Sequence, residues 1–490
     1  MADRAPHFEH LFRRAGFGIS ASESDRLAST TSYRDVVDSL LVFDRQAMDV
    51  DTLIGTPGYV GITSPGPFTP GRDIGHARQR WLFRLVHSRA PLGEKMALIW
   101  HHHFATAYSK IQGIYGAADA TRMMAATAAE DIAGMRGQIE LFRDAGLGRF
   151  EDLLVAVARD PAMLVWLDGR ANSKTNPQEN FGRELMELFT IGVDNYTESD
   201  VYAAARVFTG WNLRVIGTAG SGTGSYEFVY DANRHETSAK EFSFPIYSSR
   251  LSSTPNRIPA RSAADGYQDG IDLIHALAFH PETARRLARR MWSWFVSETS
   301  APDARFVTDV SRAYLDNGTA IRPMLRAIFT SDAFQDPSTW YARYAWPVEF
   351  VVRALTEVGH QGYSVNSALT PLVNMGQQLF EPPDVNGWET GPGWFSTGGM
   401  LARMNFASQL AANQRVALRE AARPAKATPE DLVDYCYSRL TLPAPEAGAR
   451  AALLNYVRSG GTWTGSDAQL LAKAAGLFHL MTGSGEYQFV

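Results

Sequence analysis

Four polar side chains recur along one stretch of the sequence at spacings of three and four residues. They are Asn180, Arg183, Glu184 and Glu187. On a helix, residues three and four apart lie on one face, so this set would form a polar stripe. Carboxylates beside a guanidinium and an amide are suited to general acid/base catalysis. We therefore take Glu184 and Glu187 as candidate catalytic residues, and Asn180 and Arg183 as candidate substrate-binding residues.

The same stretch also fits a solvated helix face whose charges pair with one another, and spacing alone favours that interpretation. Residues three apart on a helix have Cβ atoms only about 5–6 Å apart. Glu184 and Glu187 are therefore poorly placed to flank one glycosidic bond, which needs a carboxyl group on either side. A second carboxylate would come from elsewhere, and Asp384 or Glu381 is the candidate.

Three adjacent histidines, His101, His102 and His103, form a second candidate site. Neutral imidazole is the commonest metal ligand. Consecutive helical residues point about 100° apart, so three of them cannot meet one ion from an intact helix. His103 also falls on an apolar stripe, where a buried, hydrogen-bonded histidine is the favoured interpretation. We predict His101 and His103 as metal ligands that converge if the helix ends near residue 101.

Two tryptophans on tight turns form a third candidate site. Trp388 follows Pro-Pro and Asn-Gly pairs, which fix turns, and Trp394 comes shortly after it. Their rings could stack on a sugar or pack beneath the loop; we favour packing, and keep both as candidate substrate-binding residues. His235 follows a Gly/Ser-rich segment and could complete a site from a lid, although a lone loop histidine is more often simply exposed.

Composition limits the classes of function. The chain is 45% hydrophobic and 20% charged, as in soluble globular proteins. Its net charge of −5 gives no electrostatic argument for nucleic acid. No apolar run reaches about 18 residues, so no membrane span is expected. No Walker loop, dinucleotide fingerprint, Gly-x-Ser-x-Gly elbow or Cys-x-x-Cys pair occurs, which lowers the nucleotide, serine-hydrolase and zinc-ribbon interpretations.

The single cysteine, Cys436, excludes an intrachain disulfide framework. No apolar leader follows Met1. We therefore expect a cytoplasmic protein if Met1 is native, and a periplasmic or secreted protein if a leader was trimmed.

Apolar residues at helical spacing run through most of the chain. Thr197 and Asp200 form a capping-box pattern, and Pro91 and Pro281 suit first-turn positions. The predicted helices are 76–90, 91–104, 117–134, 149–159, 178–191, 198–209, 266–279, 281–297, 303–316, 321–330, 345–358 and 398–420.

The predicted fold class is mainly α, a multi-helix globular domain with long loop insertions and minor β-hairpin content. The best strand patterns are 225–230 and 241–247, and the long loops are 52–75 and 214–262. At 490 residues the chain exceeds the usual size of a single core. We predict an N-terminal helical region (1–212) with the His and Glu motifs, a Gly/Ser-rich insertion with short strands (213–262), and a C-terminal helical region (263–490).

Short polar motifs follow one another along nearly the whole chain, at residues 10–18, 94–106, 179–192, 195–198, 209–211, 234–235, 382–388 and 405–407. In this order they resemble the bacterial DUF1800 family. The resemblance implies a large, mostly helical protein of a family that often looks exported, with genes that often neighbour those of DUF1501 proteins. The present chain differs in lacking a leader.

The resemblance identifies no catalytic residue in this chain, because the family has no assigned function. The chain has His102 where asparagine is common in the family, which makes His102 a poor candidate for an essential ligand. His101 and His103 match the family pattern better.

Dispersed motifs rich in His, Glu, Asn, Arg and Trp predict one shared pocket. We expect a hydrolase that acts on a glycan or related polyol polymer by carboxylate general acid/base catalysis. One alternative is a metal-dependent enzyme, redox chemistry included, that holds a divalent metal with His101, His103, Glu184 and His235. The other is a non-catalytic assembly or export partner of a DUF1501-type protein.

Overall fold

The structure is a computed structural model that describes residues 6–42, 45–246 and 256–490. Over these residues it is mainly helical with two small antiparallel sheets, which confirms the predicted fold class. The strands are β1 (Trp211–Ile216), β2 (Ser225–Tyr230), β3 (Lys240–Glu241) and β4 (Arg257–Ile258). The helices are α1 (Pro6–Ala15), α2 (Ala21–Thr30), α3 (Tyr33–Leu40), α4 (Arg45–Met48), α5 (Ile74–His87), α6 (Pro91–His103), α7 (Tyr108–Ala125), α8 (Gln138–Ala145), α9 (Phe150–Ala158), α10 (Pro161–Trp166), α11 (Asn180–Glu184), α12 (Glu198–Val207), α13 (Tyr267–Ala278), α14 (Pro281–Phe295), α15 (Ala304–Leu315), α16 (Ile321–Phe329), α17 (Asp332–Gln335), α18 (Pro347–Glu357), α19 (Asn366–Asn374), α20 (Thr397–Asn413), α21 (Arg415–Ala422), α22 (Pro429–Arg439), α23 (Ala447–Arg458) and α24 (Asp467–Thr482).

Local sequence signals set several helix starts as predicted. Pro91 and Pro281 lie in the first turns of α6 and α14, where the missing N–H costs no helical hydrogen bond. At the start of α12, the Thr197 side chain accepts from the Asp200 N–H, and the Asp200 carboxylate accepts from the Thr197 N–H at 2.7 Å. The predicted capping box is therefore confirmed.

Two helix predictions are wrong, one in where the helix ends and one in its continuity. The helix predicted at 117–134 is α7, which ends at Ala125 and is broken at Gly116 by a φ of 76°. A capping box between Thr127 and Glu130 starts a separate short turn and stops α7. The helix predicted at 398–420 is divided into α20 and α21 at Gln414. Apolar residues keep their helical spacing beyond Ala125 and across Gln414, so this spacing could not predict either boundary.

The strands partly match prediction. The strand predicted at 225–230 is β2, which pairs antiparallel with β1 so that Trp211 faces Tyr230. The second half of β1 lies inside the loop predicted at 214–262, and β1 itself was not predicted as a strand. The strand predicted at 241–247 is reduced to β3, and its last residue lies outside the described part of the chain.

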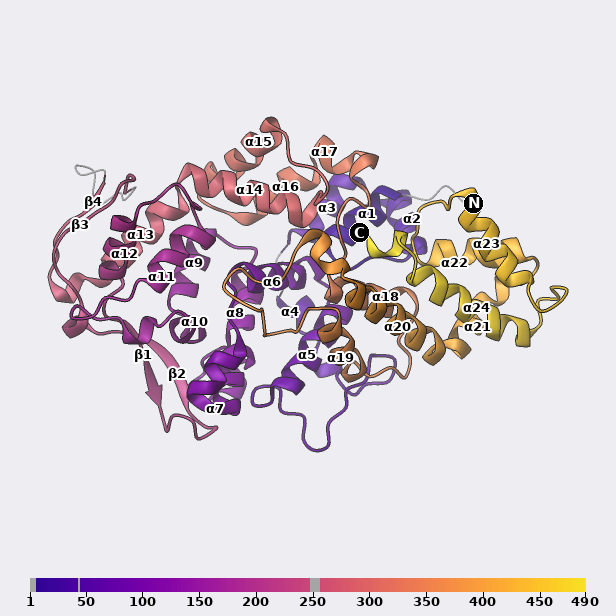
Figure 1. The fold of residues 1–490 in the computed structure, drawn as a ribbon, viewed down its shortest axis with the longest axis horizontal. Coiled ribbons are helices and arrows are strands. Elements are labelled where there is room, and N and C mark those ends of the chain that lie inside the picture. The colour runs from indigo at the N-terminus through magenta and orange to yellow at the C-terminus, as the bar shows by residue number, and fades with distance from the viewer. Residues whose placement is uncertain (1–5, 43–44, 247–255) are drawn as a thin grey trace.

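Helix α6 lies at the centre of the molecule (Figure 1), and every residue from Leu92 to His103 is buried. A helix that is buried on all sides must have packing partners on all sides. Contacts with α1, α4, α5 and α8 provide part of this shell. The three histidines at the end of α6 are therefore enclosed by protein.

Helices from the predicted N-terminal and C-terminal regions pack directly against one another. α1 contacts α14, α3 contacts α16, and α5 contacts α18 and α19. The molecule is elongated, with β3, β4, α12 and α13 at one end and α21–α24 at the other (Figure 1). Among the described helices, none combines the length and the apolar character that a membrane crossing requires.

Candidate functional site

A polar hollow of about 370 Å³ lies where the end of α6, the second half of α14 and the turn at residues 382–390 meet. These three segments are far apart in the sequence, and two of them carry motifs that predicted a site. The hollow is lined by His102, Arg290, Ser293, Trp294, Glu298, Pro383, Asp384, Asn386, Gly387, Trp388, Glu389 and Thr390.

His102 connects α6 to the turn. The Trp388 N–H donates to His102 Nδ1 at 3.1 Å. Burial, together with the nearby positive charge of Arg290, lowers the pKa of His102 to about 3, so the ring is neutral near pH 7. A neutral ring that accepts at Nδ1 carries its hydrogen on Nε2. His102 can therefore donate one hydrogen bond at the hollow that it lines.

The turn itself approaches His102 closely because of a glycine. Gly387 has a φ of 91°, and a Cβ at this position would lie 2.3 Å from His102 Nδ1. Only glycine combines that conformation with that approach. Asp384 Oδ1 accepts from the Asn386 N–H at 2.7 Å, which closes the turn. The Asn-Gly pair thus sets the wall of the hollow.

His103 links the hollow to the segment after α11. That segment ends in a π-helical turn over Leu185–Phe189, a form often found at functional sites. His103 Nε2 lies 3.2 Å from the Phe189 carbonyl oxygen, and Arg290 Nη1 donates to His103 Nδ1 at 2.9 Å. Burial lowers the pKa of His103 well below its ordinary value, which keeps Nδ1 free to accept. The neutral ring therefore fixes the position of Arg290.

Arg290 is the cationic group of the hollow. Burial, and then the charge of Arg286, lower its pKa to about 9. Its guanidinium carbon lies 6.0 Å from the ring centre of Trp294. It forms no ion pair with any carboxylate of the described residues, and its one hydrogen bond goes to His103. A partly buried guanidinium without an acidic partner is unusual, because charged groups are costly to bury unpaired.

Glu298 is the enclosed carboxyl group of the hollow, with its side chain only 6% exposed. Its oxygens accept from the N–H groups of Gly391 and Tyr344, both at 2.9 Å. Burial nevertheless raises its pKa above the ordinary glutamate value. Asp384 and Glu389, in contrast, are exposed at the same hollow. The hollow therefore holds carboxyl groups in two different environments.

The predicted polar stripe makes local contacts instead of lining the hollow. Arg183 forms ion pairs with Glu198 at 2.8 Å and Glu179 at 3.3 Å, near the surface. Asn180 donates to Asp168 Oδ2 at 3.1 Å. For Asn180 and Arg183, these contacts match the solvated-face interpretation.

The two carboxylates of the stripe are also placed apart from the hollow. Glu187 accepts a short hydrogen bond from Tyr196 Oη. Burial raises the pKa of Glu184, and the neighbouring charge of Glu187 adds to the effect. The stripe reaches the hollow only indirectly, through the Phe189 carbonyl and His103.

The predicted ligand set of His101, His103 and Glu184 is not assembled. His101 is enclosed by aromatic rings, with Trp388 at 5.2 Å and Trp81 at 5.5 Å, and burial lowers its pKa to about 3. The helix continues to His103, so the rings point in different directions. Nowhere in residues 6–42, 45–246 and 256–490 do three or more His, Cys, Asp or Glu side chains gather as metal ligands would.

The two tryptophans of the turn are buried. Trp394 is 2% exposed and packs on Trp346, so it belongs to the core and offers no ring face to a sugar. Trp388 is 3% exposed and lies nearly parallel to the His102 ring. Of the pair, Trp388 lines the hollow and Trp394 does not. Turns that bring bulky rings inward bury apolar area, which explains the packing.

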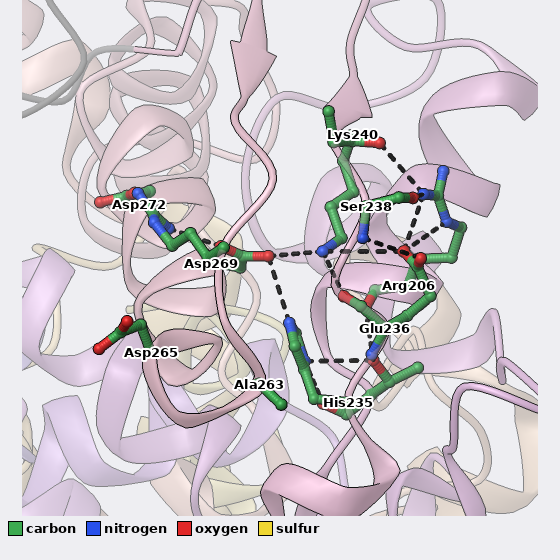
Figure 2. Close-up of polar contacts among 12 residues, drawn as sticks. Arg206, His235, Glu236, Ser238, Lys240, Ala263, Asp265, Asp269 and Asp272 are labelled. Atoms are coloured by element: carbon green, nitrogen blue, oxygen red, sulfur yellow. Dashed lines mark hydrogen bonds and ion pairs between the residues drawn. The ribbon is translucent and has the colours of Figure 1, made fainter.

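His235 lies in a separate, buried charge network (Figure 2) and does not line the hollow. Its Nδ1 is 2.8 Å from the Thr209 carbonyl oxygen, and its Nε2 is 3.4 Å from Asp269. Asp269 also pairs with Lys240 at 2.6 Å and with Arg261 at 2.5 Å. The predicted lid role has no support in this arrangement, in which the histidine ties the segment after β2 to α13.

Sequence reasoning missed Arg290 and Glu298. Both lie on or just after a helix that was predicted from its apolar face, and neither belongs to a recognisable motif. The sequence offers one weak signal, four arginines within two turns of α14, of which Arg285 is paired with Glu282.

Comparisons with known proteins agree with the motif resemblance. A family model described as "Protein of unknown function (DUF1800)" matches residues 10–489. No curated protein and no solved structure matches the chain.

Proposed function

Since the chain belongs to the DUF1800 family, which has no assigned function, we propose a function from the site itself. The protein is a hydrolase that acts on a glycan or related polyol by carboxylate general acid/base catalysis, and the hollow is its active site. Glu298 is the general acid and Asp384 the base. This proposal keeps the reaction expected from the sequence and moves its centre away from Glu184 and Glu187.

The observation that carries the proposal is the raised pKa of Glu298 in a hollow that also holds exposed carboxylates. A general acid must keep its proton near the working pH, and burial has this effect on a carboxyl group. A base must be accessible to water and substrate, and the exposed Asp384 meets that need. Carboxyl groups in contrasting environments are the usual means of dividing these two roles.

The rest of the lining suits a substrate with many hydroxyl groups. His102 offers an N–H donor, while Ser293, Asn386 and Thr390 can both donate and accept hydrogen bonds. Trp294 adds an apolar edge. A small number of placed polar groups beside an aromatic ring is the typical composition of a ligand site.

The test is release of reducing ends from a panel of neutral and acidic polysaccharides. We expect Glu298→Gln to lower kcat about 10²–10⁴-fold, the usual contribution of a general acid. Glu282→Gln is the matched control, because Glu282 is at the start of α14, is paired with Arg285 and is absent from the hollow. Glu184→Ala and Glu187→Ala should keep turnover. Loss of activity in either of them, with Glu298→Gln still active, would return the site to the stripe.

A second candidate function is assembly with a DUF1501-type protein. One observation favours it: a largely apolar groove of about 810 Å³ beside α1 and α22, with Trp340, Tyr435 and Tyr437 in its wall. Exposed apolar surface of this kind is typical of protein interaction sites. Co-expression with a DUF1501-type protein and size-exclusion chromatography test this function, and separate elution of the two proteins would exclude it.

A further inference from the structure

The unpaired charge of Arg290 has no role in the acid/base steps. Arg290 lines the hollow, yet no carboxylate among the described residues forms an ion pair with it. Among the acidic residues of the same hollow, Glu298 accepts from the N–H groups of Tyr344 and Gly391, and Asp384 accepts from the Asn386 N–H. The third, Glu389, is exposed. The hollow therefore has a cationic part and an acidic part that do not neutralise each other.

A second arginine reinforces the cationic part. Arg286 lies one helical turn before Arg290 and donates to the Leu188 carbonyl oxygen. The charge of Arg286 is among the causes that disfavour a charged Arg290. Glu187 lies near Arg286 and offsets part of its charge. The positive charge that a bound anion would offset is therefore mainly that of Arg290.

The guanidinium is also held ready for a ligand. Arg290 uses Nη1 to reach His103, and His103 is held in turn by the Phe189 carbonyl. The other donors of the planar fork remain for a second partner, and this fork matches a carboxylate in bidentate geometry. Fixing the side chain beforehand reduces the entropy lost on binding.

From this geometry we infer that the substrate carries a carboxylate, as in a uronic acid unit, and that Arg290 binds it. The identification of the ligand as a sugar rests on the proposed function; the anionic group rests on Arg290 alone. A singly charged carboxylate suits the hollow better than a doubly charged phosphate, because three acidic side chains share the space. Arg290 is therefore a specificity-determining residue.

Isothermal titration calorimetry, which measures the binding of sodium glucuronate and of glucose, tests the inference without any turnover. We expect the wild-type protein to bind glucuronate at least about tenfold more tightly than glucose, and Arg290→Gln to remove that preference. Arg290→Lys keeps the charge but loses the fork, so it should recover part of the preference. Arg289→Gln is the matched control, since Arg289 is the adjacent, exposed residue of α14.

Equal binding of glucuronate and glucose by the wild-type protein would overturn the inference, and that comparison depends on no variant. So would a loss of preference in Arg289→Gln as large as in Arg290→Gln. Glu298→Gln separates the two proposals, because it should lower kcat about 10²–10⁴-fold and keep glucuronate binding. Glucuronate binding without hydrolysis of any polysaccharide would refute the hydrolase alone. Hydrolysis of neutral glycans without preference for acidic ones would refute the carboxylate inference alone.

Discussion

Replacement of Gly387 by alanine tests whether the turn really rests on His102. The added Cβ would lie 2.3 Å from His102 Nδ1 and 2.5 Å from the His102 carbonyl oxygen. Neither neighbour can retreat easily, because one is a buried ring and the other is helix backbone. The left-handed φ of 91° adds strain of about 1–2 kcal/mol for any residue with a Cβ. Forcing an extra carbon into a packed interior adds about 1–3 kcal/mol.

Gly387→Ala should therefore lower the free energy of unfolding by about 2–5 kcal/mol, the sum of those two costs. Gly391→Ala provides the control in the same segment. Gly391 also has a positive φ, of 60°, but a Cβ there would meet no atom within 4 Å, so only the backbone cost applies.

The assay is urea unfolding of the wild-type protein and both variants, followed by tryptophan fluorescence and circular dichroism. The informative quantity is the difference between the two variants, about 1–3 kcal/mol, because the backbone cost cancels in it. Equal destabilisation by Gly387→Ala and Gly391→Ala would refute the close approach of the turn to α6. The hollow would then have a different wall.

Three further predictions concern buried polar groups. Folding raises the pKa of Glu298, so ionisation of this carboxyl group opposes folding. The wild-type protein should therefore lose stability relative to Glu298→Gln as the pH rises above 4.5, the ordinary pKa of glutamate. A difference in melting temperature between the two proteins that stays constant with pH would contradict this. Asp269→Asn should cost about 3–5 kcal/mol in urea unfolding, since it removes the nearer of the two carboxylates that pair with the fully buried Lys240 and leaves only Glu236, at 3.8 Å. Glu241→Gln removes only an exposed ion pair and should cost about 0–1 kcal/mol. Similar costs for the two variants would show that the network is not buried. His103→Leu should lower the free energy of unfolding by about 1–3 kcal/mol, because the Phe189 carbonyl and the Arg290 guanidinium both lose their hydrogen-bond partner. It should also weaken glucuronate binding. A fully stable variant would argue against the hydrogen bonds that connect Phe189, His103 and Arg290.

Local sequence patterns predicted most of the secondary structure because the causes of that structure are local. Apolar spacing, first-turn prolines and the Thr197–Asp200 capping box act within a few residues, and the structure contains each of them. The wrong helix boundaries have causes that the periodicity of apolar residues does not show. A capping box at Thr127 ends α7 inside a stretch that still has helical spacing.

The candidate site was predicted less well, since it depends on contacts between distant segments. The motif at 382–388 and the histidine run both contribute to the hollow, as their residue types suggested. The member of the run that lines it is His102, which was the least favoured of the three. The charged stripe, which looked most like a catalytic face, is occupied by its own ion pairs.

The amino-acid sequence by itself determined the helical fold class, the family and the turn chemistry at Asn386 and Gly387, because these follow from neighbouring residues and from motif order. Only the tertiary structure decided which polar groups meet. Arg290 carries no special signal in an amphipathic helix, and it stands out only because packing buries it on His103 without a carboxylate. Glu298 likewise owes its raised pKa to burial by distant parts of the chain, which outweighs the opposing effect of the N–H groups of Tyr344 and Gly391. Desolvation and pairing depend on the whole fold, so no local pattern could have identified either residue.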